Sequence, residues 1–371
     1  MEQIIMGIKS VRIQNFKSIR DSGEVDLRAM NVLIGANGAG KSNFISFFKF
    51  LSRLYEEQLQ LYVNRNGRAN GFLYFGSQTS AFLAGKVVFS NDYNFEHWFK
   101  LVQDQSGSLT LETEKWKPSS TTFELNGSPE SMVRFFEGNY KEFSKIRSAF
   151  RSFKTFHFHD TSFNAKVKQP SNTTDYAYLH EDAGNLAAFL YRLQEKEVNI
   201  FRMIVNVIRS IAPFFDQFYL QPDEINADQI FLRWREKGSE QLWNAHGLSD
   251  GTLRMICLTT LLLQPSPPAT IIIDEPELGL HPFAIAKLAA MLQSASQKAQ
   301  VIISTQSVTL LDHFDADDVI VAERVEELHG RSETVFKRQN EESLRDWLQE
   351  YTLGQLWEKN VIGGRPGGVP S

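Results

Sequence analysis

A glycine-rich run at residues 35–42, GANGAGKS, is the first reactive pattern in the sequence. It fits G-x-x-x-x-G-K-[ST], in which the glycines let backbone N–H groups close around phosphates. In that pattern Lys41 reaches the terminal phosphates of a nucleotide and the Ser42 hydroxyl coordinates Mg²⁺. The residues expected to contact the nucleotide are Gly35, Ala36, Asn37, Gly38, Ala39, Gly40, Lys41, Ser42 and Asn43. An ordinary glycine-rich turn is the alternative.

The flanking residues favour the phosphate-binding loop over the turn. Residues 30–34 (MNVLI) form an apolar run typical of a buried strand. After Lys41 the apolar residues recur at helical spacing, at Phe44, Ile45, Phe47, Phe48, Leu51 and Leu54. The sequence therefore predicts the order of strand, loop and helix that the motif requires, with the phosphates at the positive end of the helix.

Two consecutive carboxylates form the second reactive pattern. Asp274 and Glu275 follow the apolar residues 269–273 (ATIII), which predict a buried strand. Ligands of open α/β sheets bind at the carboxyl ends of the strands. Beside a phosphate-binding loop, Asp274 is suited to hold the Mg²⁺ shell and Glu275 to orient or deprotonate the attacking water. An acidic turn after a core strand is the alternative.

Together with residues 248–251 (LSDG), this acidic pair resembles the ATP-binding-cassette (ABC) class of ATPases, and the soluble DNA-associated branch is the most similar. Residues 8–19 (IKSVRIQNFKSI) resemble the first strand of RecF, SMC and OLD-type proteins, and residues 275–282 (EPELGLHP) resemble OLD-like ATPases. Residues 353–360 (LGQLWEKN) and 363–366 (GGRP) are similar to a bacterial family of stand-alone "predicted AAA ATPases" (AAA_21-like) without a Toprim domain.

The resemblance implies that the signature motif caps the γ-phosphate held by a second subunit, so ATP should hold a homodimer together, with a higher oligomer left open. The signature residues are Leu248, Ser249, Asp250, Gly251 and Thr252. Ser249 also suits the N-cap of a helix through residues 255–263, where its hydroxyl and the helix dipole would attract an anion. Asp250 stands where many transporters carry glycine. A plain helix start is the alternative.

Residues 301–307 (VIISTQS) fit the final switch strand of the class, with Gln306 where a histidine is usual. An amide can donate to the γ-phosphate, but it carries no proton or charge near neutral pH. Gln306 should therefore join Lys41 and Glu275 in the catalytic set and make ATP hydrolysis slow. His281 aligns with the D-loop position, where a polar residue crosses the dimer interface; a surface turn is the alternative.

We expect an α/β fold, a bilobed ABC-type ATPase head over residues 1–371 with a mixed or parallel P-loop core sheet. Alternation predicts an antiparallel β-subdomain at about 86–128, and helical periodicity, including residues 183–211, predicts a signature lobe at about 129–265. Residues 266–371 should hold the Walker B strand, the switch strand and a helix over 341–358. The lobe is too short for the coiled-coil arms of SMC proteins.

A net charge of −5 argues against a polycationic nucleic-acid coat, although the segment 141–168 has seven basic residues and two acidic ones. The candidate DNA contacts in it are Lys141, Lys145, Arg147, Arg151 and Lys154. A solvated helix face is the alternative. The single cysteine, Cys257, excludes a disulfide framework, and the sequence shows neither a signal peptide nor a membrane span, so we expect a cytoplasmic protein.

His157, His159 and Asp160 form a compact cluster, and alternation on a strand would place both histidines on one face. A structural role is favoured over metal binding because a third ligand is missing nearby. The expected cofactors are ATP and Mg²⁺ alone.

Two functions fit these motifs. The first is an ATP-dependent sensor or regulator that dimerises on ATP and controls a separately encoded effector, such as a Toprim nuclease in anti-phage defence. This role rests on the resemblance. The second is a RecF-like clamp on duplex DNA. A transporter ATPase fits less well, since both ends of the chain resemble the soluble branch.

Overall fold

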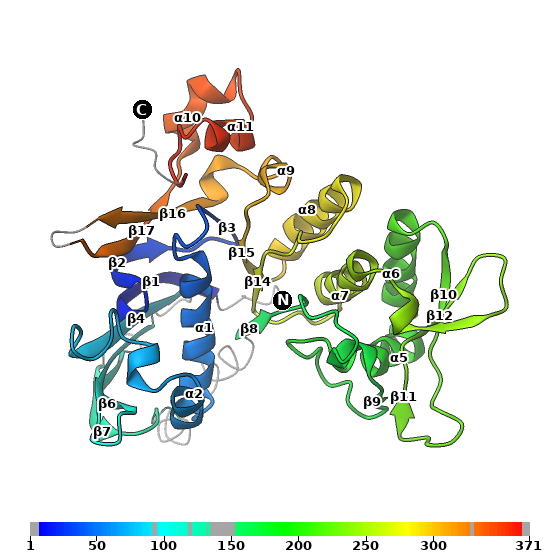
Figure 1. Ribbon diagram of the computed structural model, residues 1–371, viewed down its shortest axis with the longest axis horizontal. Helices are drawn as coiled ribbons and strands as arrows, with labels where there is room; N and C mark the ends of the chain where they lie inside the picture. The colour runs from blue at the N-terminus through cyan, green and yellow to red at the C-terminus, as the bar shows by residue number, and fades with distance from the viewer. Residues whose placement is uncertain are drawn as a thin grey trace. The chain divides into compact units, whose positions relative to one another are not determined.

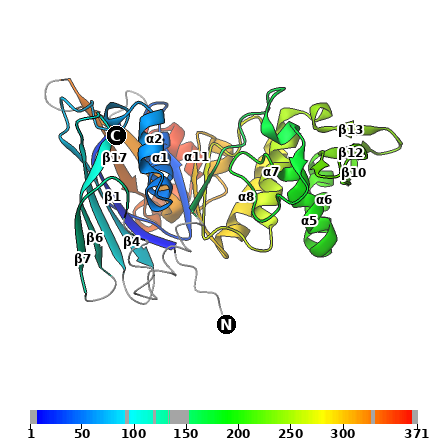
Figure 2. The same cartoon turned by 90° about the horizontal axis from the view of Figure 1, so that it is seen from below.

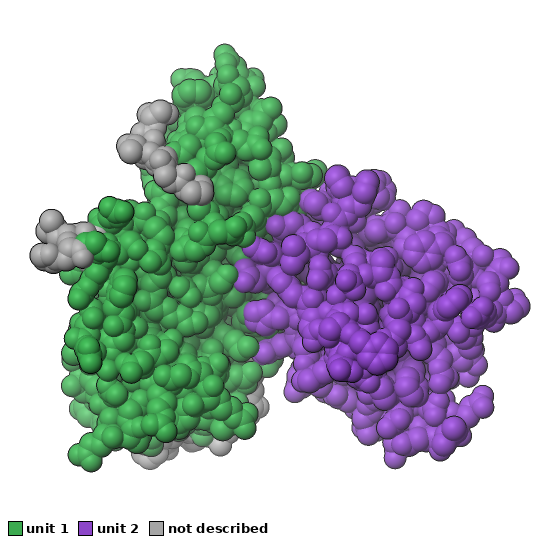
Figure 3. All heavy atoms as spheres, viewed as in Figure 1, with its two compact units in different colours: residues 1–155, 268–272, 298–371 green, residues 156–267, 273–297 purple. Residues whose placement is uncertain are grey.

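The computed structural model describes residues 7–90, 95–117, 121–131, 133, 153–326 and 330–365. The chain divides into two compact units (Figure 3). Unit 1 comprises residues 1–155, 268–272 and 298–371, and unit 2 comprises residues 156–267 and 273–297. The P-loop therefore lies in unit 1, whereas the signature motif lies in unit 2.

The core sheet contains the strands that carry the nucleotide motifs (Figure 1). Its strand order is β17 (Ser332–Arg338), β16 (Val319–Glu326), β3 (Met30–Ile34), β15 (Gln300–Ser304), β14 (Thr270–Asp274) and β8 (Phe153–Phe156). β3 pairs in parallel with both β15 and β16, while β16 and β17 form an antiparallel hairpin. β3 and β15 are buried throughout, as their mostly apolar sequences predict for parallel strands covered on both faces.

A second six-stranded sheet is antiparallel throughout its described pairs (Figure 2). Its order is β2 (Ile19–Asp26), β1 (Gly7–Phe16), β4 (Phe82–Ser90), β5 (Glu96–Gln103), β6 (Leu109–Lys117) and β7 (Phe123–Ser128). The antiparallel strands expected within residues 86–128 are thus present. They do not stand alone, because β1 pairs with β4 and brings the N-terminal hairpin into the same sheet.

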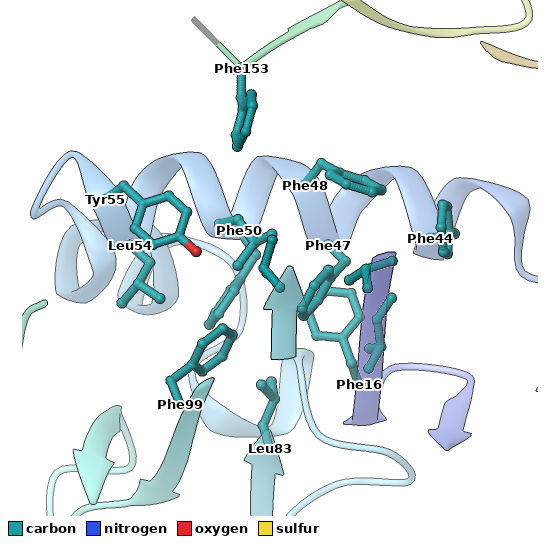
Figure 4. Packing of buried hydrophobic residues seen from close by; sticks show 14 of the residues in the cluster. Phe16, Phe44, Phe47, Phe48, Phe50, Leu54, Tyr55, Leu83, Phe99 and Phe153 are labelled. Carbon is teal, nitrogen blue, oxygen red and sulfur yellow. The ribbon is translucent and has the colours of Figure 1, made fainter. Parts of the chain in front are cut away.

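Helix α1 (Lys41–Tyr55) begins directly after the P-loop and is anchored by aromatic packing (Figure 4). Phe44, Phe47 and Phe50 are fully buried. Phe47 packs edge-on against Phe16 of β1 at 5.4 Å between ring centroids and stacks on Phe99 of β5 at 6.3 Å. Full burial of one such side chain contributes roughly 1.5–3 kcal/mol. The helix is therefore held firmly against the antiparallel sheet.

The last residue of α1, Tyr55, enters a buried polar network. Its hydroxyl lies 2.7 Å from His97 Nδ1, and His97 Nε2 lies 3.1 Å from Glu114 Oε1. Ser131 donates to the same carboxylate oxygen at 2.6 Å. Burial lowers the pKa of His97, although Glu114 opposes that change. A neutral imidazole that accepts from Tyr55 and donates to Glu114 fits these partners.

Unit 1 contains three short helices after β15: α9 (Val308–Leu311) before β16, and α10 (Glu341–Leu348) and α11 (Leu353–Glu358) after β17. The single helix expected over residues 341–358 is wrong. The chain breaks after α10 because Thr352 starts a new helix, in which its side chain and that of Gln355 form a reciprocal capping box. Unit 1 also contains α2 (Leu59–Arg65) and the 3₁₀ turns η1 (Ala69–Gly71) and η4 (Ala316–Asp318).

Unit 2 is the helical lobe, with the periodicity at residues 183–211 resolved into two helices. Its helices are α5 (Leu186–Lys196), α6 (Val198–Ile211), α7 (Asp250–Leu263) and α8 (Pro282–Ser296), with 3₁₀ turns η2 (Lys166–Lys168) and η3 (Ala245–Gly247). The lobe also holds β-structure that the periodicity did not indicate. The antiparallel strands are β10 (Phe215–Tyr219), β12 (Arg233–Glu236) and β13 (Leu242–Asn244), and the pair β9 (Ser171–Asn172) and β11 (Gln229–Ile230).

Candidate nucleotide-binding site

The P-loop connects β3 to α1 and has room only for glycine at two of its positions. A Cβ on Gly35 would lie 2.3 Å from the Ala322 carbonyl oxygen of β16. A Cβ on Gly40, which has φ +106°, would lie 2.3 Å from Thr334 Oγ1 of β17. The β16–β17 hairpin therefore packs directly against the loop, with β16 at Gly35 and β17 at Gly40. Gly40 caps α1 without any side-chain hydrogen bond, so the helix N-terminus is suited to an anion.

Lys41 is folded back over the loop. The side chain is buried, and its ammonium donates to the carbonyl oxygens of Gly35 at 2.7 Å and Ala36 at 3.2 Å. This places a positive charge inside the loop that backbone amides would close around phosphates. Ser42 is exposed, whereas the Asn43 amide donates to Ser18 Oγ at 2.7 Å. Asn43 thus ties α1 to the turn between β1 and β2.

Gln306 follows the strand next to the P-loop strand. The two strands are parallel, with Ser304 opposite Leu33, and the Thr305 N–H donates to the Leu33 carbonyl at 2.9 Å. Gln306 is therefore the second residue beyond β15, at the same carboxyl edge from which the P-loop departs. It is half-buried. Within unit 1 the structure thus brings together the P-loop, Lys41 and Gln306.

A segment far along the chain also contacts the P-loop. A Cβ on Gly364, which has φ +83°, would lie 3.3 Å from Gly35 Cα and 2.8 Å from Val321 Cγ1. The Gly364 N–H donates to Glu323 Oε1 of β16 at 2.5 Å. The resemblance marked residues 363–366 without giving them a role. Paired glycines after a capped helix are the signal for such a close approach of two backbones.

The acidic pair lies in unit 2, at the end of β14. Asp274 is the last strand residue, and both Asp274 and Glu275 are half-buried. Glu275 has φ +43°, a left-handed conformation that is uncommon outside glycine. The Asp274 carbonyl accepts a hydrogen bond from His159 Nε2 at 2.7 Å. The chain therefore turns sharply at Glu275, and the peptide between Asp274 and Glu275 accepts a hydrogen bond from His159.

The signature motif begins α7 as the sequence predicts. Ser249 is its N-cap and accepts from the Thr252 N–H at 3.2 Å. Leu248 is buried, whereas Ser249 and Asp250 are exposed. The Asp250 carboxylate lies 4.0 Å from the Lys168 ammonium, which offsets part of the negative charge of this carboxylate.

The signature motif and the loop after the Walker B strand form one surface of unit 2. Arg254 of α7 donates to the Leu278 carbonyl at 2.7 Å, and a Cβ on Gly251 would lie 2.7 Å from the Gly279 carbonyl oxygen. His281 is the N-cap of α8, and its Nδ1 accepts from the Phe283 N–H at 3.3 Å. His281 is exposed, as are the apolar side chains of Leu278 (44%) and Phe283 (53%).

The histidine cluster is not on a strand, because β8 ends at Phe156. The expected alternation of His157 and His159 on one face is therefore wrong. The His157 N–H donates to the Glu181 carbonyl, whereas the His159 side chain reaches Asp274. Across the described residues, no group of three or more His, Cys, Asp or Glu side chains is placed to hold a metal ion.

Most of the candidate DNA contacts are residues that the structure does not describe. Lys141, Lys145, Arg147 and Arg151 lie outside the described residues. Lys154 is described, and its ammonium lies 3.6 Å from Glu56 Oε1 with about one fifth of the side chain exposed. No helix in the described part of the chain is long and apolar enough to cross a membrane.

Comparison with solved structures shows the fold. An Smc head bound to the C-winged helix domain of ScpA gives a TM-score of 0.60 at 14% identity, covering 91% of this chain and 99% of that chain. An Smc head domain with an extended coiled coil, bound to the C-terminal domain of ScpA derived from Pyrococcus furiosus, gives 0.55 at 13% identity, covering 93% and 99%. The chain is thus similar to SMC heads in its fold.

Two curated proteins are similar to part of the chain. The phosphate import ATP-binding protein PstB of Mycoplasmoides gallisepticum is 25% identical over 134 residues, 34% of this chain and 40% of the relative. The urease accessory protein 2 of Cryptococcus neoformans var. grubii is 41% identical over 91 residues, 23% of this chain and 7% of the relative. The chain spans less than half the length of either relative.

One protein family matches most of the chain. The family described as "AAA domain, putative AbiEii toxin, Type IV TA system" matches residues 30–312, a range that includes the P-loop, the signature motif, the acidic pair and Gln306. Because this range is well over half of the 371 residues, the chain belongs to that family, and its fold is that of SMC heads.

Proposed function

We propose that the protein binds Mg-ATP in its P-loop, forms a homodimer around the nucleotide, hydrolyses it slowly and thereby controls a separately encoded effector. The observation that carries the nucleotide part is the uncapped N-terminus of α1 above the buried ammonium of Lys41. Backbone amides, helix dipole and a lysine charge converge there, which is the chemistry that binds a triphosphate.

The proposal for a dimer is supported by the surface that joins the signature motif to the D-loop. Arg254 ties the two loops together, so Ser249 and His281 belong to one exposed face of unit 2. Leu278 and Phe283 expose apolar side chains on the same loop and helix start. A polar, anion-attracting helix start beside exposed apolar residues suits a face that meets a second copy and its nucleotide.

For the reaction, we assign Ser42 and Asp274 to hold Mg²⁺ and Glu275 to accept a proton from the attacking water. A hydroxyl in the first turn of α1 and a carboxylate at a strand end are oxygen donors of the kind that Mg²⁺ prefers. When bound, the ion would neutralise charge on the phosphates. The neutral Gln306 amide donates to the γ-phosphate without supplying charge, so turnover is slow.

The regulatory role draws on the family and on the fold. The family description names a toxin of a toxin–antitoxin system, which supports a role in anti-phage defence. SMC heads in the compared structures bind ScpA, which supports binding of a separate protein by a head of this fold. A cytoplasmic location fits both. We propose that the ATP-bound dimer is the state that the effector recognises.

The dimer is tested with Glu275→Gln, which should bind ATP, hydrolyse it at only a small residual rate and run as a dimer in analytical ultracentrifugation. Lys41→Ala is the control and should stay monomeric, because it lacks the charge that holds the phosphates. Adding Ser249→Arg to Glu275→Gln should restore the monomer by blocking the signature surface. A Glu275→Gln protein that binds ATP and remains monomeric at micromolar concentration contradicts the composite site.

The effector is tested by co-purification with the product of the neighbouring gene, with and without ATP.

The DNA clamp stays as the alternative function from the sequence. It predicts salt-sensitive DNA binding and DNA-stimulated ATPase activity, both lost when Lys145, Arg147 and Arg151 are neutralised. Of the described residues in that basic segment, Lys154 is paired with Glu56, which does not favour a phosphate contact.

A further inference from the structure

His159 lies between the signature helix and the end of the Walker B strand, all within unit 2. Its Nε2 is 2.7 Å from the Asp274 carbonyl oxygen, and its own carbonyl accepts from Arg254 Nη2 at 3.0 Å. A carbonyl oxygen only accepts, so His159 Nε2 carries the hydrogen of this bond. One side chain and one peptide of the same residue thus connect α7 to the acidic pair.

The hydrogen bond falls on the peptide that sets the direction of Glu275. Glu275 is held at φ +43°, and a non-glycine residue in this region costs on the order of 1–2 kcal/mol. The angle φ is the rotation about the N–Cα bond of Glu275, and it relates the preceding peptide plane to the rest of the residue. Since His159 fixes that plane through the Asp274 carbonyl, it fixes the direction in which the Glu275 side chain leaves the backbone.

Arg254 extends this connection to the signature motif. Its guanidinium spans two carbonyls, those of His159 and Leu278, so it joins the segment that carries His159 to the loop after the acidic pair. Its Nε is buried without a hydrogen-bond partner among the described residues. The cation therefore serves as a clamp on backbone carbonyls, with no carboxylate at Nε to compete for it.

We propose that His159 is a positioning residue for Glu275, which it keeps in the strained conformation that aims the carboxylate at the attacking water. Through Arg254, His159 also contacts the signature helix of the same protomer. In the dimer that helix serves the partner's nucleotide, so His159 connects it to the Glu275 carboxylate of its own protomer. The inference rests on the proposed function, since it takes Glu275 as the proton acceptor.

The test compares substitutions at His159 that keep or remove the donor. His159→Gln places an amide NH₂ at the position of Nε2 and should keep kcat within about threefold of wild type, because the bond is preserved. His159→Phe keeps the ring but not the donor and should lower kcat at least tenfold, part of the roughly 10²–10⁴-fold that a placed base supplies. ATP affinity should not change in either variant.

Controls separate this role from general damage. His159→Asn is a smaller change that leaves the amide short of Asp274, and it should match His159→Phe even if the latter folds poorly. His180→Gln alters a surface histidine of the same unit, paired with Asp175, and should leave kcat unchanged. In a Glu275→Gln background, His159→Asn should cause no further loss of the residual rate, because both changes act through one carboxylate.

The outcomes distinguish the inference from the function beneath it. If Glu275→Gln hydrolyses ATP at the wild-type rate, the role of Glu275 fails and the inference fails with it. If Glu275→Gln abolishes hydrolysis but His159→Asn retains the wild-type kcat, only the positioning role is overturned. Equal losses for His159→Gln and His159→Asn, with lowered Tm in both, would assign the residue to packing and overturn it as well.

Discussion

The contact between Gly364 and the P-loop predicts that a single methyl group there weakens ATP binding. Gly364→Ala introduces a Cβ 3.3 Å from Gly35 Cα and 2.8 Å from Val321 Cγ1. Gly35 is also bounded on another side, because a Cβ built on it would lie 2.3 Å from the Ala322 carbonyl oxygen. The overlap must therefore displace the Val321 side chain, the C-terminal segment or the first residue of the phosphate cradle.

The magnitude follows from two contributions, and a matched variant separates them. An alanine at φ +83° costs about 1–2 kcal/mol of backbone strain. Overpacking adds about 1–3 kcal/mol. Gly330→Ala carries similar strain at φ +72°, but its Cβ would meet no atom of the described residues within 4 Å, so it should lack the second contribution. If about 1.4 kcal/mol of the overlap is relieved by moving the P-loop, the Kd for ATP rises about tenfold.

The assay is a pair of measurements on both variants. Urea denaturation gives the free energy of unfolding, and titration with a fluorescent ATP analogue gives Kd. We expect Gly364→Ala to lose more stability than Gly330→Ala and to bind ATP more weakly, while Gly330→Ala binds as wild type does. Equal stability losses and an unchanged Kd in Gly364→Ala would refute the claim that this segment supports the P-loop.

Three further predictions follow from the described side chains. Gln306→His should raise the ATPase rate, because a protonated imidazole neutralises transition-state charge; an unchanged, already fast steady-state rate would contradict the role given to Gln306. Burial lowers the pKa of His97, so the folded protein binds fewer protons at this residue than the unfolded chain does. The free energy of unfolding should therefore keep its full value above the unfolded pKa of about 6.5. At lower pH it should fall by up to about 1.4 kcal/mol per pH unit. Urea midpoints from pH 8 to 5.5 check this, and His97→Gln should lose that part of the slope. Burial raises the pKa of the Cys257 thiol far above its ordinary value, so iodoacetamide at pH 8 should label it only in urea; rapid labelling of the folded protein would contradict its burial.

Local patterns predicted the motifs well, because each motif depends on neighbours in the sequence. The P-loop between β3 and α1 and the Ser249 N-cap of α7 are set by glycines, caps and apolar spacing within a few residues. These are the short-range signals that the sequence carries most strongly. The Asp274 strand end is of the same kind.

The unpredicted parts depend on contacts between distant residues. The contact of His159 with Asp274 could not be predicted, because the two residues are 115 positions apart in the sequence. The pairing of β1 with β4, and of β3 with β16, likewise joins segments that local periodicity cannot relate. The break between α10 and α11 could have been found, since Thr352 and Gln355 carry a capping-box signal inside the expected helix.

The support of Gly35 by Ala322 and Gly364 has a consequence for how the protein is made. A ribosome that adds roughly 5–20 residues per second delivers Gly364 some 15–65 seconds after Gly35. Most of the antiparallel sheet and its phenylalanine-rich helix can assemble early, because their strands follow one another closely in the chain. The phosphate cradle, by contrast, is completed only near the end of translation. A nascent chain would therefore bury its aromatic-rich helix against the antiparallel sheet well before it can sequester ATP.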